Sequence, residues 1–344
     1  MNVLDIVLPL TGLEFSVPLL IGLGLTVGIL AGFFGIGGGW IVTPTLHLLG
    51  FPIPFAIGTE LANITAQSGM AIPKHNKMGT VEPTLGLAMG IAMALGMEAG
   101  AQTVMYMESL GLAGDTIRWA YVVFLGGLGL WMQYDYWTHS EEAEQTESTE
   151  VASSPNDTSV REQWGHFPPF ITLQKSGMQV SLWTILGVGL VIGCVAGIMG
   201  CGGGFILVPA LIYVIGVPTV VAVGTSLICI LFAGAYGTFT YALKGRVELL
   251  AALWMVLGAV VGVQIGASAL RYIKGYSLRF LYCTMLLAAA ASVLLKQLGK
   301  GQLATVMMLS SVGVLCCVIV TRMCRAYFGE KKTTTEEAPC GPSE

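Results

Sequence analysis

The feature that most constrains the fold is a series of apolar runs, each about 18 to 25 residues long with few or no charges. A helix needs about 20 predominantly apolar residues to cross a bilayer. Because the runs are continuously apolar rather than alternating in polarity, they favour helices over a lipid-facing barrel. Only 10% of the 344 residues are charged, against about 25% in soluble domains. We therefore expect an all-α polytopic membrane protein.

Polar breaks divide the expected membrane segments into two groups, with boundaries placed to within about four residues. Some segments are short enough to form re-entrant hairpins, so we expect about 9 to 11 membrane segments. The first group covers residues 17–34, 40–50, 55–73, 81–106 and 117–137, and the second covers 180–199, 205–216, 219–243, 247–270, 277–296 and 302–324.

Between the groups lies an acidic stretch in which Glu and Asp alternate with Ser, Thr, Pro and Asn. Such a composition is typical of a solvated, flexible linker. The expected organisation is an N-terminal membrane repeat (1–137), an acidic flexible linker (138–178), a C-terminal membrane repeat (179–300), an additional membrane helix (301–325) and a disordered tail (326–344).

The two groups repeat each other. The sequence AGFFGIGGGWIVTP at 31–44 aligns with AGIMGCGGGFILVP at 196–209, with eight identities in fourteen positions, five of them glycine. Internal duplication is typical of secondary transporters, whose substrate site lies between the repeats.

The basic residues favour an inverted relation between the repeats. If each glycine-broken stretch returns to the side it left, eleven of the sixteen basic residues share one side, whereas single crossings divide the sixteen evenly. The positive-inside rule then places the linker and the C-terminus in the cytoplasm. The five residues expected on the opposite side are Arg118, Lys244, Arg246, Lys296 and Lys300.

Three consecutive glycines interrupt a segment in each half. Glycine weakens a helix by about 1 kcal/mol relative to alanine, so a short helix should begin after each run. The exposed amide groups and the helix dipole would form an anion site without a basic side chain. The alternative is that the glycines only permit close helix packing. The predicted substrate-binding glycines are Gly37, Gly38, Gly39, Gly202, Gly203 and Gly204.

Polar side chains accompany the breaks. Thr59, Asn63 and Gln67 are spaced four apart and share one helical face, and the second half keeps Thr225 and Ser226. Polar groups at membrane depth usually face a cavity or the bundle interior. We predict that these five side chains bind the anion, and interhelical hydrogen bonding is the alternative.

Glu60 lies beside that face and is a candidate for proton coupling. A carboxylate near an anion site would repel the substrate unless it were protonated, and burial favours the neutral form. His47 is a second candidate because imidazole titrates near neutral pH, although a merely hydrogen-bonded or interfacial histidine is the alternative. The basic turn at 74–77 could attract anions or could only set the topology.

The eight cysteines form no C-x-x-C pair and no cluster with metal-ligand spacing. Most of them lie in or beside apolar segments, where cysteine acts as a small hydrophobic residue. We expect no metal, no cofactor and no enzymatic activity. The N-terminal residues lack the basic stretch and small-residue cleavage site of a secretory signal, so no processing is expected.

The doubled G-x-G-G-G break, the short segments that end at Pro44 and Pro209, and the P-x-x-x-A-x-G-T stretch that follows each of them resemble the sulfite exporter TauE/SafE family. This family is also known as the toluene sulfonate uptake permeases. The resemblance covers about 17–137 and 180–296, and implies a carrier of the inner (cytoplasmic) membrane for sulfite, organosulfonates or related anions. The chain departs from shorter members in its acidic linker and its additional C-terminal segment.

Three functions therefore compete. The first is a secondary transporter of a small sulfur-containing anion, coupled to protons through Glu60 or His47. The second is a passive anion channel with the glycine dipoles as its filter. The third is a membrane sulfur relay that uses Cys201, although no basic partner lies near it in sequence. The expected partners are the anion and the bilayer, a homodimer is left open, and no nucleic acid is expected.

Overall fold

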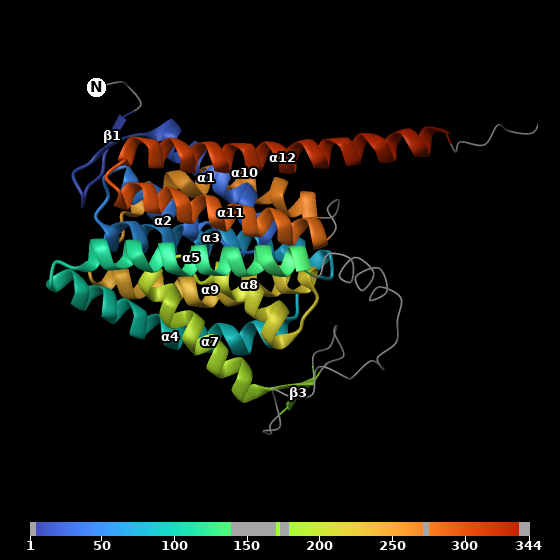
Figure 1. The fold of residues 1–344 in the computed structure, drawn as a ribbon, viewed down its shortest axis with the longest axis horizontal. Coiled ribbons are helices and arrows are strands. Elements are labelled where there is room, and N and C mark those ends of the chain that lie inside the picture. Colours follow the sequence, from blue (N-terminus) through green and yellow to red (C-terminus); the bar gives the residue numbers. More distant parts are fainter. Residues whose placement is uncertain (1–4, 139–169, 173–178, 271–274, 337–344) are drawn as a thin grey trace, which may run out of the picture.

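The computed structural model describes residues 5–138, 170–172, 179–270 and 275–336, and these form an all-α bundle, as expected (Figure 1). The first half contains α1 (Val17–Phe34), α2 (Gly39–Leu48), α3 (Ile53–Lys77), α4 (Pro83–Ser109) and α5 (Ala113–Thr138). The second half contains α7 (Leu182–Met199), α8 (Gly204–Ala210), the π-helical turn η1 (Leu211–Ile215), α9 (Thr219–Leu243), α10 (Leu249–Ala269), α11 (Gly275–Gln297) and α12 (Gly301–Glu336).

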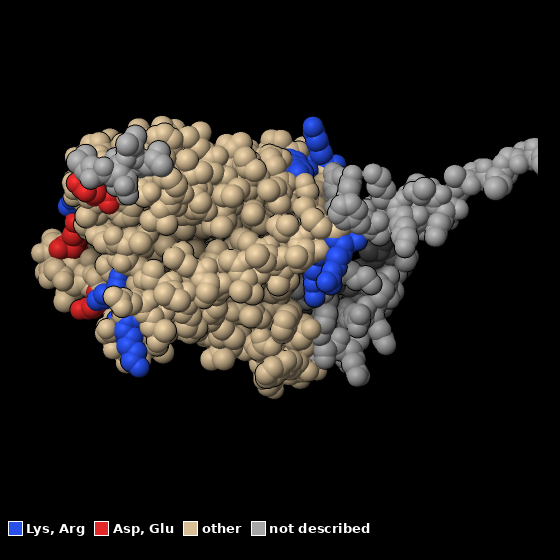
Figure 2. Space-filling view, turned by 90° about the horizontal axis from the view of Figure 1, so that it is seen from above, with Lys and Arg blue, Asp and Glu red and all other residues tan. Residues whose placement is uncertain are grey.

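Among the described residues, seven helical stretches are long and apolar enough to cross a membrane. They comprise α1, α4, α7, α9, α10 and the apolar parts of α11 and α12. The surface agrees, because Lys, Arg, Asp and Glu gather at the two ends of the face seen in Figure 2 and leave a band of other residues between them. The expectation of a multi-pass membrane protein is confirmed.

The helix boundaries agree with the expected segments to within four residues, except at the end of α12. There the helix continues to Glu336, through part of the stretch expected to be a disordered tail. Residues 325–336 contain no proline and only one glycine, so nothing in the sequence ends the helix earlier. Residues 337–344 lie outside the described part.

Two short hairpins that the apolar pattern did not predict precede α1 and α7. The first pairs β1 (Asp5–Val7) with β2 (Glu14–Ser16), and the second pairs β3 (Phe170–Thr172) with β4 (Gln179–Ser181). β3 falls inside the expected linker, of which 139–169 and 173–178 lie outside the described residues. In Figure 1 the two hairpins lie at opposite ends of the bundle.

Small residues bring the long helices of the two halves into backbone contact. A β-carbon added to any of the packing glycines of α1 or α10 would lie 1.9–2.9 Å from backbone atoms of the other helix. α7 meets α4 in the equivalent way, with Gly193 against Met93 and Gly100 against Cys194. Glycines four residues apart are the pattern that lets membrane helices approach closely. They are Gly24, Gly28 and Gly32 in α1 and Gly258, Gly262 and Gly266 in α10.

The equivalent helices α3 and α9 pack against each other in opposite directions. Gly58, near the start of α3, lies against Tyr241 near the end of α9, while Gly69 lies against Leu231. The start of α3 thus lies beside the end of α9, so the two helices run antiparallel where the halves meet.

Candidate functional site

The two glycine breaks cross each other inside the bundle. A β-carbon on Gly39 would lie 2.3 Å from the Cα atom of Cys201, and one on Gly204 would lie 2.0 Å from the carbonyl oxygen of Ile36. The two contacts are equivalent, because each joins the start of one short helix to the break before the other. Only glycine fits at positions 39 and 204, so the breaks bring the halves together where α2 and α8 begin.

Each break also needs glycine for its backbone conformation. Gly35 and Gly200, which end α1 and α7, both have φ of 67°, and Gly37 and Gly202 have φ of 63° and 64°. Side chains disfavour this left-handed region, whereas glycine enters it freely. The sequence prediction that the triple glycines interrupt the helices is therefore confirmed, and close packing is a second role at the same place.

Glu60 of α3 lies beside the first break. Its Oε1 atom is 3.4 Å from the position that a β-carbon on Gly38 would occupy, and Oε2 accepts a 2.8 Å hydrogen bond from Asn63 Nδ2. The residue is fully buried. The carboxyl group thus lies next to the start of α2, where a helix dipole favours negative charge.

Several polar atoms of α3 are buried without a hydrogen-bond partner among the described residues. They include Oε1 of Glu60, Oδ1 of Asn63, the side-chain amide nitrogen and oxygen of Gln67, and the hydroxyl of Ser68. The indole N–H of Trp40, the second residue of α2, is in the same condition. A buried polar group without a partner costs about 1–3 kcal/mol, so this concentration of such groups is unusual for a packed interior.

Apolar side chains close the space beside the crossing. Ile64 of α3 and Ile230 of α9 both pack on the breaks, with the Cδ1 atom of Ile64 2.4 Å from a β-carbon built on Gly202. The Cγ2 atom of Ile230 is 3.1 Å from the same position. The central site predicted from the glycines is thus packed shut in this conformation.

Three of the predicted substrate ligands make hydrogen bonds between the halves. The hydroxyl of Thr59 accepts from the amide of Glu248 at 2.9 Å, and that of Thr225 accepts from the amide of Glu82 at 3.0 Å. Ser226 donates to the carbonyl oxygen of Gly35. These contacts match the interhelical alternative, and a role of the three side chains toward an anion remains a prediction.

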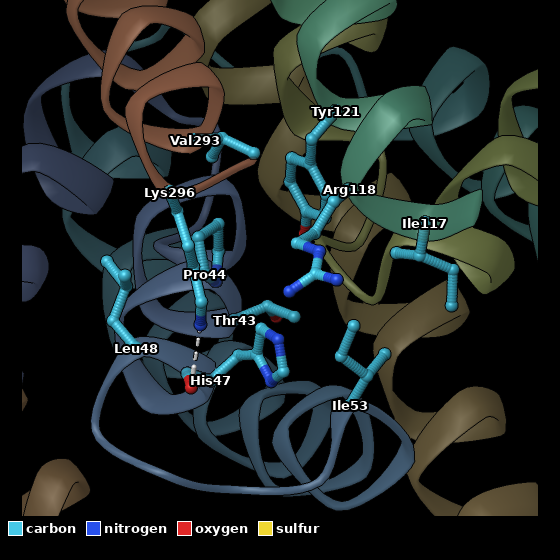
Figure 3. A pocket seen from close by; sticks show the side chains of 10 residues that line it. All are labelled: Thr43, Pro44, His47, Leu48, Ile53, Ile117, Arg118, Tyr121, Val293 and Lys296. Carbon is cyan, nitrogen blue, oxygen red and sulfur yellow. Dashed lines mark hydrogen bonds between the residues drawn. The ribbon is translucent and has the colours of Figure 1, made fainter. Parts of the chain in front are cut away.

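His47 lies in a pocket between α2, α5 and α11, and Glu60 is not among the described residues that line it (Figure 3). Its Nδ1 is 2.9 Å from the carbonyl oxygen of Phe51, and its Nε2 has no partner in the part of the chain that the structure describes. The pocket is lined by Thr43, Pro44, His47, Leu48, Ile53, Ile117, Arg118, Tyr121, Val293 and Lys296.

The basic residues at 74–77 form the last turn of α3, and two of them contact neighbouring helices. His75 is fully buried, with Nε2 3.0 Å from the carbonyl oxygen of Gly32. Lys74 donates to the carbonyl oxygen of Gln264 in α10 at 2.6 Å. Both residues thus fix the end of α3 to neighbouring helices, which the sequence pattern could not reveal.

Sequence reasoning missed several of these residues. It treated Arg118 and Lys296 only as markers of topology and assigned neither Tyr121 nor Ser68 to a site. The available signal was that a charged residue in or beside an apolar segment is costly and therefore usually functional.

The profile of the family described as sulfite exporter TauE/SafE matches residues 20–293, a range that includes both glycine breaks. The chain belongs to this family. The resemblance inferred from the doubled motif is confirmed, and the matched range ends before α12. No solved structure matches this member of the TauE/SafE family.

Relatives from two bacteria align with most of the chain. A probable membrane transporter protein of Xylella fastidiosa is 26% identical over 248 residues, which are 72% of this chain and 82% of the relative. Probable membrane transporter protein YunE of Bacillus subtilis is 25% identical over 262 residues, which are 74% and 88% of the two chains. Both the family and these relatives thus belong to the class of membrane transporters.

Proposed function

We propose that this protein is a secondary transporter that moves sulfite, an organosulfonate or a related small sulfur-containing anion across the cytoplasmic membrane. The observation that carries the proposal is the group of buried, unpartnered polar atoms on α3, of which the Oε1 atom of Glu60 lies beside the start of α2. The donors among these atoms, the amide nitrogen of Gln67 and the hydroxyl of Ser68, together with the indole N–H of Trp40, suit the oxygen atoms of a small anion. The description of the family supplies the sulfur chemistry.

Glu60 explains how such a site could couple to protons. Its carboxyl group is next to Gly38, where an anion would bind. Two negative charges this close repel each other strongly in a medium of low dielectric constant. Entry of the anion therefore requires Glu60 to be protonated or to move away, so a proton travels with the substrate in the first case.

We further propose that the halves are inverted repeats and alternate access by moving against each other. The antiparallel packing of α3 on α9 supports this, since a two-fold axis relates antiparallel helices only if it is perpendicular to them. Such an axis lies in the membrane plane. Ile64 and Ile230 then close the path in the present conformation and must separate from the breaks when either side opens.

The test is anion flux into proteoliposomes that contain the full chain. Wild-type flux of sulfite should saturate with concentration, and Gln67→Met should lower it about tenfold or more, because the amide that holds the anion is removed. Gln102→Met is the matched control, since Gln102 is exposed on α4 and should leave flux unchanged.

Two results would contradict the proposal. Equal flux in Gln67→Met and Gln102→Met would remove the α3 site from the path. Unitary currents in planar bilayers that carry all of the anion movement would replace the carrier by a channel.

A further inference from the structure

The pocket between α2, α5 and α11 carries two basic side chains and no acidic one among the described residues that line it. Arg118 comes from the start of α5, and Lys296 comes from the end of α11. Figure 3 shows the guanidinium group, the ammonium group and the ring of His47 turned toward one space. Chain segments about 70 and 250 residues from α2 thus bring positive charge to the end of this short helix.

The positive charge of the pocket is only partly compensated. Lys296 donates a 3.0 Å hydrogen bond to the carbonyl oxygen of His47, a neutral acceptor. Arg118 pairs with Asp115, whose side chain is 72% exposed to solvent and so contributes little. The Nε atom of Arg118 is buried and has no partner in the described part of the chain.

His47 adds a group that responds to the protonation of a ligand. The carbonyl oxygen of Phe51 can only accept, so Nδ1 of His47 carries the proton of that contact. In the neutral ring the buried Nε2 therefore carries a lone pair, which can accept a hydrogen bond from the hydroxyl group of a protonated oxyanion. In the charged ring the same atom donates to a fully ionised oxyanion.

The floor of the pocket rests on the second glycine break. Thr43 donates to the carbonyl oxygen of Gly200 at 3.2 Å, and Tyr121 donates to that of Met199. The walls are formed by Ile53, Ile117 and Val293, which limit the access of water and so strengthen the electrostatic attraction inside. The floor of the pocket thus lies against the end of α7 and the start of the second break.

The corresponding place at the other end of α5 has opposite chemistry. There Asp135 accepts a 2.7 Å hydrogen bond from the hydroxyl of Tyr213 in η1. A carboxylate in that position would repel an anion, whereas Lys296 and Arg118 attract one. Among the described residues, one end of α5 thus carries the basic groups of the pocket and the other end carries a carboxylate.

We propose that this pocket is a binding site for a small oxyanion, which Arg118 and Lys296 hold by charge-assisted hydrogen bonds and His47 Nε2 completes. Its position on the path rests on the proposed transport function, because it makes the pocket the first site that the anion reaches from this end. Binding itself does not depend on transport.

The test is equilibrium binding to the purified full chain in detergent, followed by calorimetry and thermal shift. Sodium sulfite and sodium methanesulfonate are titrated at constant ionic strength against sodium chloride. Wild type should give saturable binding, and Arg118→Gln should weaken it about tenfold or more because a charge-assisted contact is lost. Lys300→Gln is the control, since Lys300 is exposed three residues beyond the end of α11 and lies outside the pocket.

Lys296→Gln could lower stability by releasing the carbonyl oxygen of His47, so Lys296→Arg is measured beside it and should retain binding. Unchanged affinity in Arg118→Gln, or no saturable response in wild type, overturns the proposal. A lipid phosphate has the same chemistry, so phosphatidylglycerol is titrated in a parallel arm. The proposal is also overturned if only the lipid, and neither soluble anion, gives a thermal shift that is lost in Arg118→Gln.

The outcomes separate the two proposals. Binding that depends on Arg118, together with wild-type liposomes that show no flux, removes the transport function and keeps the pocket. Flux that depends on Gln67 with no binding at Arg118 removes the pocket and keeps the transport function.

Discussion

Gly39 and Cys201 approach so closely that a β-carbon on the glycine would lie 2.3 Å from the Cα atom of the cysteine. The contact joins the start of α2 to the break after α7, and the equivalent contact joins Gly204 to Ile36. The crossing therefore depends on two residues that have no side chain, one in each half.

Gly39→Ala should destabilise the protein by about 2 kcal/mol or more, because its methyl group meets backbone that cannot move aside. Thermal unfolding in detergent, followed by size-exclusion chromatography, measures the loss. Gly22→Ala is the control, since no atom lies within 4 Å of a β-carbon there and alanine favours the helix by up to about 1 kcal/mol. Equal melting temperatures of the two variants would show that the breaks are not in contact.

A second prediction concerns the paired threonines. Thr59→Val and Thr225→Val each leave a buried backbone amide, that of Glu248 or Glu82, without this acceptor. Each should lower the free energy of unfolding by about 1–3 kcal/mol. Because the two contacts are equivalent, the two losses should be similar in size.

The control for the threonines is Thr103→Val. The hydroxyl of Thr103 donates within its own helix, to the carbonyl oxygen of Ala99, and its removal should change stability by less than about 0.5 kcal/mol. A loss in Thr59→Val no larger than that in Thr103→Val would contradict a structural role of the contact.

The apolar runs and the triple glycines predicted much of this fold. The run at 219–243 coincides with α9, and both short helices begin at the last of three consecutive glycines, Gly39 and Gly204. These features could be read from the sequence because they are local: lipid requires about 20 apolar residues, and glycine alone tolerates the left-handed backbone.

The candidate site was less accessible to sequence reasoning. Asn63 and Gln67 were predicted from their spacing, and the structure leaves polar atoms of both buried and unpartnered among the described residues. The pocket of Arg118 and Lys296 could not be predicted, because its residues come from helices that meet only in the tertiary fold. For the same reason the sequence could not show that the hydroxyl of Thr59 accepts a hydrogen bond from the other half, and a role of Thr59 toward the anion stays a prediction.

Glu60→Gln should change the pH dependence of anion flux. Glutamine keeps the size of the side chain and can still bond to Asn63, but it carries no charge at any pH. If a proton on Glu60 accompanies the anion, flux driven by a pH gradient should fall about tenfold or more in the variant, while exchange without a gradient continues. Liposomes with a set inside and outside pH measure both rates.

Glu14→Gln is the control for Glu60, because Glu14 is exposed in the first hairpin. Its flux should respond to a pH gradient as the wild type does. If anion flux in Glu60→Gln responds to the pH gradient as strongly as in wild type, Glu60 does not carry the coupled proton.

The last prediction concerns Cys201, which would be indispensable in a sulfur relay. Cys201 is fully buried at the crossing of the breaks, and Ile36 occupies its place in the first half. A thiol enclosed in this way is remote from any reagent in solution, and the equivalence with isoleucine indicates a packing role. Cys201→Ala should therefore retain anion flux within about twofold of wild type, at a modest cost in stability from the small cavity. Cys317→Ala, at an exposed cysteine of α12, is the matched control in the same liposome assay. Complete loss of flux in Cys201→Ala, with a melting temperature near that of Cys317→Ala, would restore the relay and remove the carrier mechanism.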